Sequence, residues 1–415
     1  MSVLPSRSGL AALPGAQHIT ISSAPEGTRH EAAVALLGIL LVALNLRAAV
    51  VCLPPIYSLV TTSFPVDSAA RSLMGTLPLL CFAVFGLLAR AASRRIGLER
   101  SLLLAMVMVA VGEAARAWLS DSMAAFALLS IVCFGGMGMG NVLLPPAIAH
   151  YFPTRVGTMS GVFQVLMVVS ASVPSLIAIP AADALGWRTY VGLWSLLGLV
   201  AALPWLRLAQ EHHAEEHPPI PLGHAAWRWP IAWAVMIVFA AGPMVMYALI
   251  AWLPQMMIDT ANVTPATAGL MLAAFNAVGL AHSLLVPMVL VKLRHPYLVI
   301  AFAVLCLCSG VLGLGYAPHT PWPWIVLAGL GCMLLNIGLT LVNMRSRTQE
   351  GTTALSSFVQ SGGYLLASAG PLIVGQLHAM NGSWVTACWF MAGVATVAGF
   401  AGVIAVRTVM IEDAD

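Results

Sequence analysis

Long apolar runs recur along the whole chain and are separated by short polar segments. Each run has about 20 residues or more, the length that a helix needs to cross a hydrocarbon core about 30 Å thick. A strand of a membrane barrel needs only about half that length, so the runs predict helices. We count twelve of them, at residues 33–61, 69–90, 101–119, 123–148, 156–180, 187–208, 230–257, 265–290, 297–316, 322–343, 354–377 and 384–406.

The composition agrees with a chain that lies mostly in a lipid bilayer. Of the 415 residues, 60% are hydrophobic and only 8% are charged, whereas soluble domains carry about 25% charged residues. The chain is therefore expected to be an all-α membrane protein with twelve transmembrane helices. The net charge of +3 is small and gives no reason to expect nucleic-acid binding.

The residues show no sign of an enzyme. The seven cysteines all fall within predicted spans, without metal-ligand spacing, and we interpret them as buried free thiols. Walker loops, nucleophile elbows and paired catalytic carboxylates are missing from the sequence, and the loops are too short to hold a catalytic domain. We therefore expect no metal, no cofactor and no enzymatic activity.

The basic residues are distributed unequally between the two sides of the membrane. Only Arg71 and Arg188 fall on one side, and Arg47 and Arg116 lie within spans. By the positive-inside rule the opposite, richer side is cytoplasmic, and both termini lie there. That side holds fourteen of the eighteen basic residues: Arg7, Arg29, Arg90, Arg94, Arg95, Arg100, Arg155, Arg207, Arg228, Lys292, Arg294, Arg345, Arg347 and Arg407.

The two halves of the chain resemble each other in order and spacing. Four matches have offsets between 195 and 200: Arg47–Pro54 with Tyr247–Pro254, Gly136 and Asn141 with Gly331 and Asn336, Ser160–Gln164 with Ser356–Gln360, and Trp187 with Trp384. Each match is weak alone, but their agreement predicts two parallel six-helix repeats. Such repeats describe the major facilitator fold, whose binding site lies between the halves.

The expected organisation has five parts. Residues 1–31 are rich in Ser, Pro and Gly without a continuous apolar run, which indicates a disordered cytoplasmic tail and not a signal peptide. Six-helix bundles are expected at 32–208 and 230–407, joined by a cytoplasmic loop at 209–229, the longest polar interior segment. A short cytoplasmic tail, 408–415, follows.

Arg47 falls near the middle of the first span. A cation at that depth costs about 3 kcal/mol, so it normally faces a bundle interior or a watery cavity and indicates a functional site. Tyr247 occupies the equivalent position in the seventh span, and the pair of a guanidinium and a phenol suits a small anion. The alternative is an arginine neutralised for structural reasons by backbone carbonyls or by Glu113.

Several amides are further candidates for substrate contact. Asn45 precedes Arg47 by two residues and is expected to orient it. Each of the others has an alternative interpretation as a hydrogen bond between helices, worth about 0.6 kcal/mol in membranes. These other amides are Asn141, Asn336, Gln164 and Gln360.

Two titratable groups within spans are candidates for proton coupling. Glu113 lies one turn from Arg116, and an i,i+3 ion pair is the preferred interpretation, with a proton acceptor as the alternative. His282 is the other titratable group within a span; a histidine can take up a proton in the physiological range, but His282 is equally explained as a packed helix residue.

Several motifs together resemble the cyanate and 2-nitroimidazole transporter family of the major facilitator superfamily. They are Asn45-Leu46-Arg47, Gly140–Pro145 with Phe152-Pro153, Trp252-Leu253-Pro254, and Arg345-Ser346-Arg347 followed by Leu355-Ser356, Gln360, Gly363-Tyr364 and Gly370-Pro371. The resemblance implies a permease of the bacterial inner membrane for a small, anionic compound. It also marks Asn45, Arg47, Asn141, Gln360 and Tyr364 as binding positions and Arg345 as a position at the cytoplasmic end.

We therefore expect a secondary transporter that moves a small anion, such as cyanate or a small organic anion, by alternating access as a monomer. Uptake of an anion against a negative-inside potential costs about 2.3 kcal/mol per charge per 100 mV and requires a co-transported cation, most simply a proton. Export does not. The alternatives are an exporter of neutral or aromatic compounds such as nitroimidazole-type drugs, and a membrane receptor or scaffold that does not transport.

Overall fold

A computed structural model describes residues 26–211, 228–293, 295–407 and 410. Within these ranges every regular element is a helix, so the predicted fold class is confirmed. Most of the expected loop at 209–229 and most of the two expected tails lie outside the described residues. The first helix already begins at Glu26.

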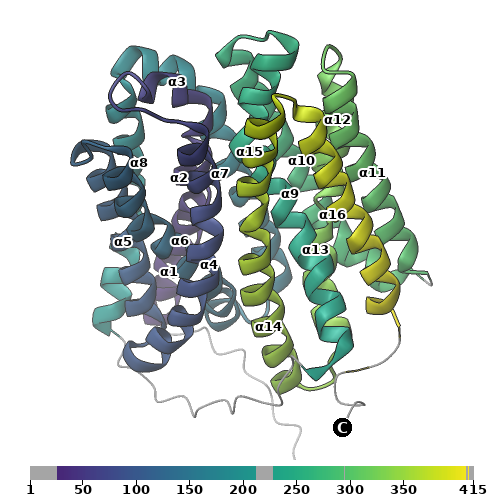
Figure 1. Ribbon diagram of the computed structural model, residues 1–415. Helices are drawn as coiled ribbons and strands as arrows, with labels where there is room; N and C mark the ends of the chain where they lie inside the picture. The colour runs from purple at the N-terminus through teal and green to yellow at the C-terminus, as the bar shows by residue number, and fades with distance from the viewer. Residues whose placement is uncertain (1–25, 212–227, 294, 408–409, 411–415) are drawn as a thin grey trace, which may run out of the picture.

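Helices α1 to α8 form the first of two bundles that stand side by side (Figure 1). In this bundle α5 packs against α6 and α8, α4 packs against α6, and α1 packs against α8. The elements are α1 Glu26–Asn45, α2 Ala48–Val51, η1 Pro54–Ile56, α3 Tyr57–Val60, α4 Ser68–Ile96, α5 Leu98–Trp118, α6 Met123–Tyr151, α7 Val156–Leu185 and α8 Trp187–Glu211.

Helices α9 to α16 form the second bundle (Figure 1). Here α11 packs against α12 and α16, and α9 packs against α13, α14 and α16. The elements are α9 Pro230–Ala261, α10 Pro265–Lys292, α11 Tyr297–Tyr316, α12 Pro321–Gly331, α13 Leu334–Met344, α14 Gln349–Ala367, α15 Ala369–Asn381 and α16 Trp384–Ala405.

Eleven described stretches are long and apolar enough to cross a membrane, counting α12 with α13 as one. The remaining predicted span, 354–377, is α14 followed by α15, which run end to end along α4 and are separated only by Ser368 (Figure 1). Pro371 contributes to this break because it has no N–H to donate to the carbonyl of Ala367. The first span is broken more deeply, between Asn45 and Tyr57.

Glycines at matching positions let helices approach closely in both bundles. A Cβ atom on Gly112 of α5 would lie 2.4 Å from the backbone nitrogen of Cys133 in α6. A Cβ on Gly310 of α11 would lie 2.2 Å from the backbone nitrogen of Ala328 in α12. Because the same helix pair makes the same close contact in each half, these positions support the internal repeat that the sequence predicts.

We expect Gly112→Ala and Gly310→Ala each to destabilise the protein by about 1–3 kcal/mol, because the new methyl group meets backbone that cannot rotate away. The measurement is the melting temperature of the purified protein in detergent. Gly393→Ala is the control, since a Cβ at Gly393 of α16 has no atom within 4 Å. Equal melting of all three variants would contradict the proposed close packing.

Candidate functional site

The break in the first span places Arg47 between two short helical pieces. The chain leaves the helical course of α1 after Asn45, and α2 starts at Ala48. The hydroxyl of Ser170 in α7 accepts hydrogen bonds from the backbone N–H groups of Arg47, at 3.0 Å, and Ala48, at 3.2 Å. A side chain from another helix therefore does what an N-cap residue does at an ordinary helix start.

At the far end of α2 the carbonyl groups lack hydrogen-bond donors, because Pro54 and Pro55 have no N–H to donate to them. The Ser175 hydroxyl of α7 donates to the carbonyl of Val51, the partner that Pro55 leaves free, at 3.3 Å. A guanidinium nitrogen of Arg116 in α5 donates to the carbonyl of Ala49 at 2.8 Å. Three side chains from two neighbouring helices thus hold the broken segment in place.

Arg116 is itself neutralised by Glu113, one turn earlier on α5. Two N–H groups of Arg116 donate to the two carboxylate oxygens of Glu113 at 2.8 and 3.0 Å. Both side chains are buried, 0% and 1% exposed, and the guanidinium also lies over the rings of Phe126 and Phe134. The ion pair expected from the i,i+3 spacing is present, and it braces the backbone next to Arg47.

Arg47 lies across the interface between the bundles and contacts the second half directly. Its guanidinium donates a hydrogen bond to the hydroxyl of Tyr247 in α9, the residue that the internal repeat pairs with it. The Tyr364 hydroxyl of α14 interacts with the same guanidinium. The ring of Phe82 in α4 lies 5.7 Å from the guanidinium carbon, within cation–π range.

Aromatic rings from both halves enclose this cation. Phe82 meets Tyr247 and Tyr364 edge-on, with ring centroids 6.2 and 5.8 Å apart. Phe239 of α9 meets Tyr364 on its other side at 5.2 Å. Within the part of the chain that the structure describes, Arg47 has no carboxylate partner. Glu113 is paired with Arg116, so the alternative in which it neutralises Arg47 is wrong.

The predicted amides lie at several depths in the bundle and do not form one cluster. Asn45 is buried and donates to the carbonyls of Leu41 and Leu197, so it ties α1 to α8 instead of bonding to Arg47. Asn141 in α6 donates to the carbonyl one turn earlier, and Gln360 in α14 donates to the Ser356 hydroxyl. Gln164 is half-buried in α7.

Two further candidates form a pair in the second bundle. The side-chain amide of Asn336 in α13 lies 2.8 Å from Nδ1 of His282 in α10, and both residues are buried. This bond links two helices and fixes the orientation of the imidazole. Arg345, just after α13, donates from Nε to the carbonyl of Ala405 at 2.8 Å and so closes the end of α16.

The bundles are bridged at the end that carries residues 61–67. There the Arg71 guanidinium of α4 donates to the Gln255 side chain of α9 at 2.6 Å. Gln255 in turn donates to Asp259 at 2.5 Å, and Asp259 accepts a further bond from Trp384 of α16. We call Arg71, Gln255 and Asp259 the polar latch.

Two further contacts of α4 with the second bundle reinforce the polar latch. The Thr76 hydroxyl of α4 donates to the carbonyl of Ser368, at the break between α14 and α15, at 2.9 Å. One residue earlier, a Cβ on Gly75 would lie 2.7 Å from Ala251 and 2.9 Å from Pro371. At the opposite end of α4, the bundles are linked by a hydrogen bond from Arg90 to Ser357 of α14.

Sequence reasoning missed two kinds of site residue. Phe82 and Phe239 are aromatic positions among many in apolar helices, and nothing in their spacing marks them. Ser170 and Ser175 carried a usable signal, since they are hydroxyl residues in an apolar span, five positions apart on one helix. Such hydroxyl residues indicate that this helix forms hydrogen bonds with a neighbouring helix, but they do not indicate which helix that is.

A family model described as the Major Facilitator Superfamily matches residues 35–354. The chain belongs to this superfamily. It is 31% identical to the 2-nitroimidazole transporter of Escherichia coli (strain K12), over 85% of this chain and 90% of that protein. It is 23% identical to the cyanate transport protein CynX of the same organism, over 84% and 91% of the two chains. These relatives confirm the resemblance seen in the motifs.

Solved structures agree with the fold at much lower identity. A mutant of the nucleoside transporter NupG has a TM-score of 0.70 at 12% identity, covering 92% of this chain and 100% of that one. A bacterial homologue of the human lysosomal transporter Spinster, in an inward-facing and occupied conformation, has a TM-score of 0.66 at 15% identity, over 92% and 95%. The protein is a multi-pass membrane transporter of this superfamily.

Glu113→Gln leaves the charge of Arg116 buried without a counter-charge, and we expect it to destabilise the folded protein by about 3–5 kcal/mol. The measurement is thermal unfolding of the purified protein in detergent. Asp121→Asn is the control, since Asp121 is an exposed carboxylate. If Glu113→Gln melts like the wild type and loses only its response to a pH gradient, Glu113 is a proton acceptor and not a structural partner.

Proposed function

We propose that this transporter moves a small monovalent anion that binds beside Arg47. The observation that carries the proposal is the half-buried guanidinium at the interface of the two bundles, which donates to the Tyr247 hydroxyl and has no carboxylate partner among the described residues. A cation in such surroundings is stabilised when an anion reaches it. A carboxylate partner would have cancelled the charge permanently, as Glu113 does for Arg116.

The chemistry around Arg47 suits a flat anion with two acceptor atoms. A guanidinium has five N–H groups in a fixed fork, and only part of this fork is used by the tyrosines. Because the Tyr247 oxygen accepts from Arg47, its own O–H proton is free to donate to a bound anion. The edges and faces of Phe82 and Tyr364 then offer apolar contact to a planar ligand.

Named relatives support this class of substrate. One is the cyanate transport protein already described. Another is a putative anionic 4-hydroxy-benzoate permease of Thauera aromatica, 30% identical over 113 residues, 26% of this chain and 68% of that one. Cyanate is a very small linear anion and 4-hydroxybenzoate is a planar aromatic anion, so the two serve as probes of the size of the site.

Transport would proceed by rocking of the two bundles about Arg47 and Tyr247. The unequal distribution of basic residues supports a bacterial inner-membrane orientation in which both termini are cytoplasmic and the polar latch faces the periplasm. The latch then closes the outer side, and breaking it opens the site outward. For proton coupling, His282 is a better candidate than Glu113, because its partner is a neutral amide and not a guanidinium.

A second candidate function is export of neutral aromatic compounds. The ring cluster of Phe82, Phe239, Tyr247 and Tyr364 favours it, as does the 31% identity to a 2-nitroimidazole transporter. In that case the tyrosine hydroxyls and Arg47 would donate to a nitro group or ring nitrogen. A receptor that binds but does not transport would show no exchange of labelled ligand.

We expect Arg47→Gln to raise the half-saturating concentration of an anionic substrate about ten- to hundredfold, because a charge-assisted hydrogen bond contributes about 1.5–3 kcal/mol. Arg47→Lys should lie between this variant and the wild type, because it keeps the charge without the planar fork. Tyr247→Phe should raise the same half-saturating concentration about two- to tenfold. The measurement is counterflow of labelled cyanate and 4-hydroxybenzoate in proteoliposomes, with Arg95→Gln as an exposed control.

The outcomes of the counterflow experiment separate the candidates. If Arg47→Gln loses exchange of the anions but still exchanges 2-nitroimidazole, the neutral compound binds through contacts other than Arg47. Wild-type exchange of both anions by Arg47→Gln and Arg47→Lys would show that the proposed counter-charge is wrong. Binding of a probe by thermal shift without any exchange would favour the receptor.

A separate experiment tests the polar latch. Gln255→Leu removes the acceptor for Arg71, and we expect it to shift the population toward the outward-open state about tenfold. The readout is the labelling rate of Ser72→Cys by a membrane-impermeant thiol reagent, because Ser72 faces Gly375 across the interface. Asp121→Asn, at an exposed position of the same end, is the control. An unchanged rate in Gln255→Leu would exclude the latch as a gate.

A further inference from the structure

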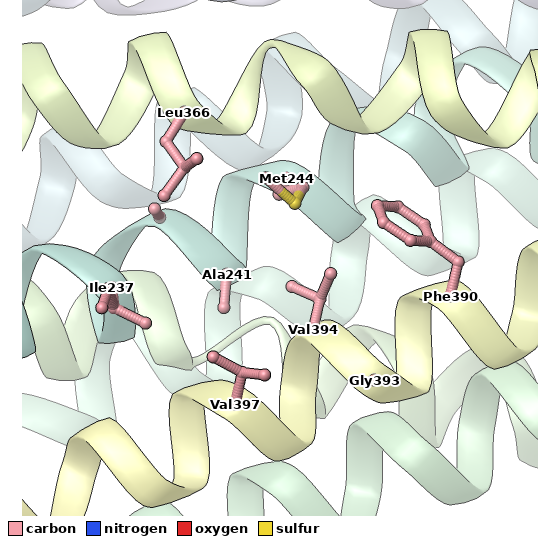
Figure 2. A pocket seen from close by; sticks show the side chains of 9 residues that line it. Ile237, Ala241, Met244, Leu366, Phe390, Gly393, Val394 and Val397 are labelled. Carbon is pink, nitrogen blue, oxygen red and sulfur yellow. The ribbon is translucent and has the colours of Figure 1, made fainter.

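An apolar groove opens on the outside of the second bundle, away from Arg47. It has a volume of about 420 Å³ and lies between α9, α14 and α16. Figure 2 shows Ile237 and Met244 on one side, Leu366 above, and Phe390, Gly393 and Val397 on the other. Its lining contains no charged or polar side chain, so it is unsuited to an anionic substrate.

A second hollow continues this groove toward the start of α9. It also has a volume of about 420 Å³ and shares Ile237 with the first. Its lining includes Trp233 and Ile404, which are both exposed, and at its end Arg228. The two hollows thus form one channel, which we call the α9–α16 groove, apolar along its length and basic at one end.

The length of the α9–α16 groove matches one leaflet of a bilayer. Along α9 it runs from Pro230 to Met244, fourteen steps of about 1.5 Å each, or about 21 Å. Half of a bilayer with its headgroup regions measures about 20–22 Å. A chain that enters beside Arg228 therefore ends near the middle of the membrane, where Phe390 and Met244 close the groove.

The basic end lies where positive charge gathers at the membrane surface. Arg228 lies two residues before α9, and Arg407 lies two residues after α16, which packs against α9. Basic residues at the ends of neighbouring helices, above an apolar crevice, are the combination that binds anionic lipid headgroups. A zwitterionic headgroup carries the same phosphate together with a cation, which the two arginines would repel.

We propose that the α9–α16 groove binds one anionic phospholipid, with an acyl chain along Ile237, Gly393 and Val397 and the phosphate beside Arg228. The bound chain lies behind Met244 and Leu366, which are within a turn of Tyr247 and Tyr364 on the same helices. The lipid therefore supports from behind the two helices that contact Arg47. This inference is independent of which substrate the transporter carries.

The test is native mass spectrometry of the full-length protein, titrated with an equal mixture of phosphatidylglycerol and phosphatidylcholine that have the same acyl chains. We expect the first bound lipid to be phosphatidylglycerol with about tenfold preference. Arg228→Gln should remove the preference but keep binding, because the apolar groove is intact. Gly393→Leu should reduce binding of both lipids several-fold by filling the groove, since a Cβ there meets no atom within 4 Å and the fold tolerates it.

Matched variants keep this result specific. Arg94→Gln removes an exposed arginine at the same end of the molecule, and Val403→Phe enlarges an exposed side chain of α16 outside the groove; both should bind like the wild type. Equal binding of the two lipids by the wild type would show ordinary lipid contact and overturn the proposal. Unchanged binding by Gly393→Leu, or dimers that form only without lipid, would assign the groove to another occupant.

Discussion

The structure depends on satisfying the backbone of one broken helix inside the membrane. Lipid offers no hydrogen bonds, and each unpaired N–H or C=O group there costs several kcal/mol. Between Asn45 and Tyr57 the helical ladder is interrupted, and side chains of Ser170, Ser175 and Arg116 replace the missing partners. The break is tolerated only because α5 and α7 supply these groups, and it turns Arg47 toward the second bundle instead of the lipid.

Two arginines near this break show how surroundings decide the role of the same side chain. Arg116 is fully buried, forms two hydrogen bonds with Glu113 and donates a third to the Ala49 carbonyl. Its charge is cancelled, so its contribution is geometric: it holds the backbone two residues from Arg47. The guanidinium of Arg47 contacts the Tyr247 hydroxyl and the rings of Phe82 and Tyr247, which orient it without neutralising it. The two arginines therefore differ in role: the charge of Arg116 stays paired, and under the proposed function the charge of Arg47 is the one that an anion approaches.

The sequence predicted the fold and the pairing of Arg47 with Tyr247 because both follow from pattern. Apolar runs defined the spans, and the internal repeat placed Arg47 opposite Tyr247, where the structure has them in contact. The helix breaks were harder to predict from the sequence. Prolines indicate where backbone hydrogen bonds are missing, but not which side chain replaces them. Asn45 shows the limit most clearly: it lies two residues from Arg47, yet its amide points to the Leu197 carbonyl of α8. Which face a polar residue uses depends on packing between helices that local sequence does not record.

The end of the interface that carries the polar latch is the end that opens in the proposed cycle. It is held by side-chain hydrogen bonds such as Arg71 to Gln255 and Thr76 to Ser368, each worth about 1–3 kcal/mol. Small residues such as Gly75 also line this end, so the two surfaces can separate without the rearrangement of large interlocked side chains. The bond from Thr76 goes to the Ser368 carbonyl, at the break between α14 and α15. Separation of the bundles would therefore remove a hydrogen bond at a place where the helix is already discontinuous. In the proposed cycle, a few weak bonds, one of them at a helix break, keep the free energies of two states similar, which is the condition under which substrate binding can shift the balance between them.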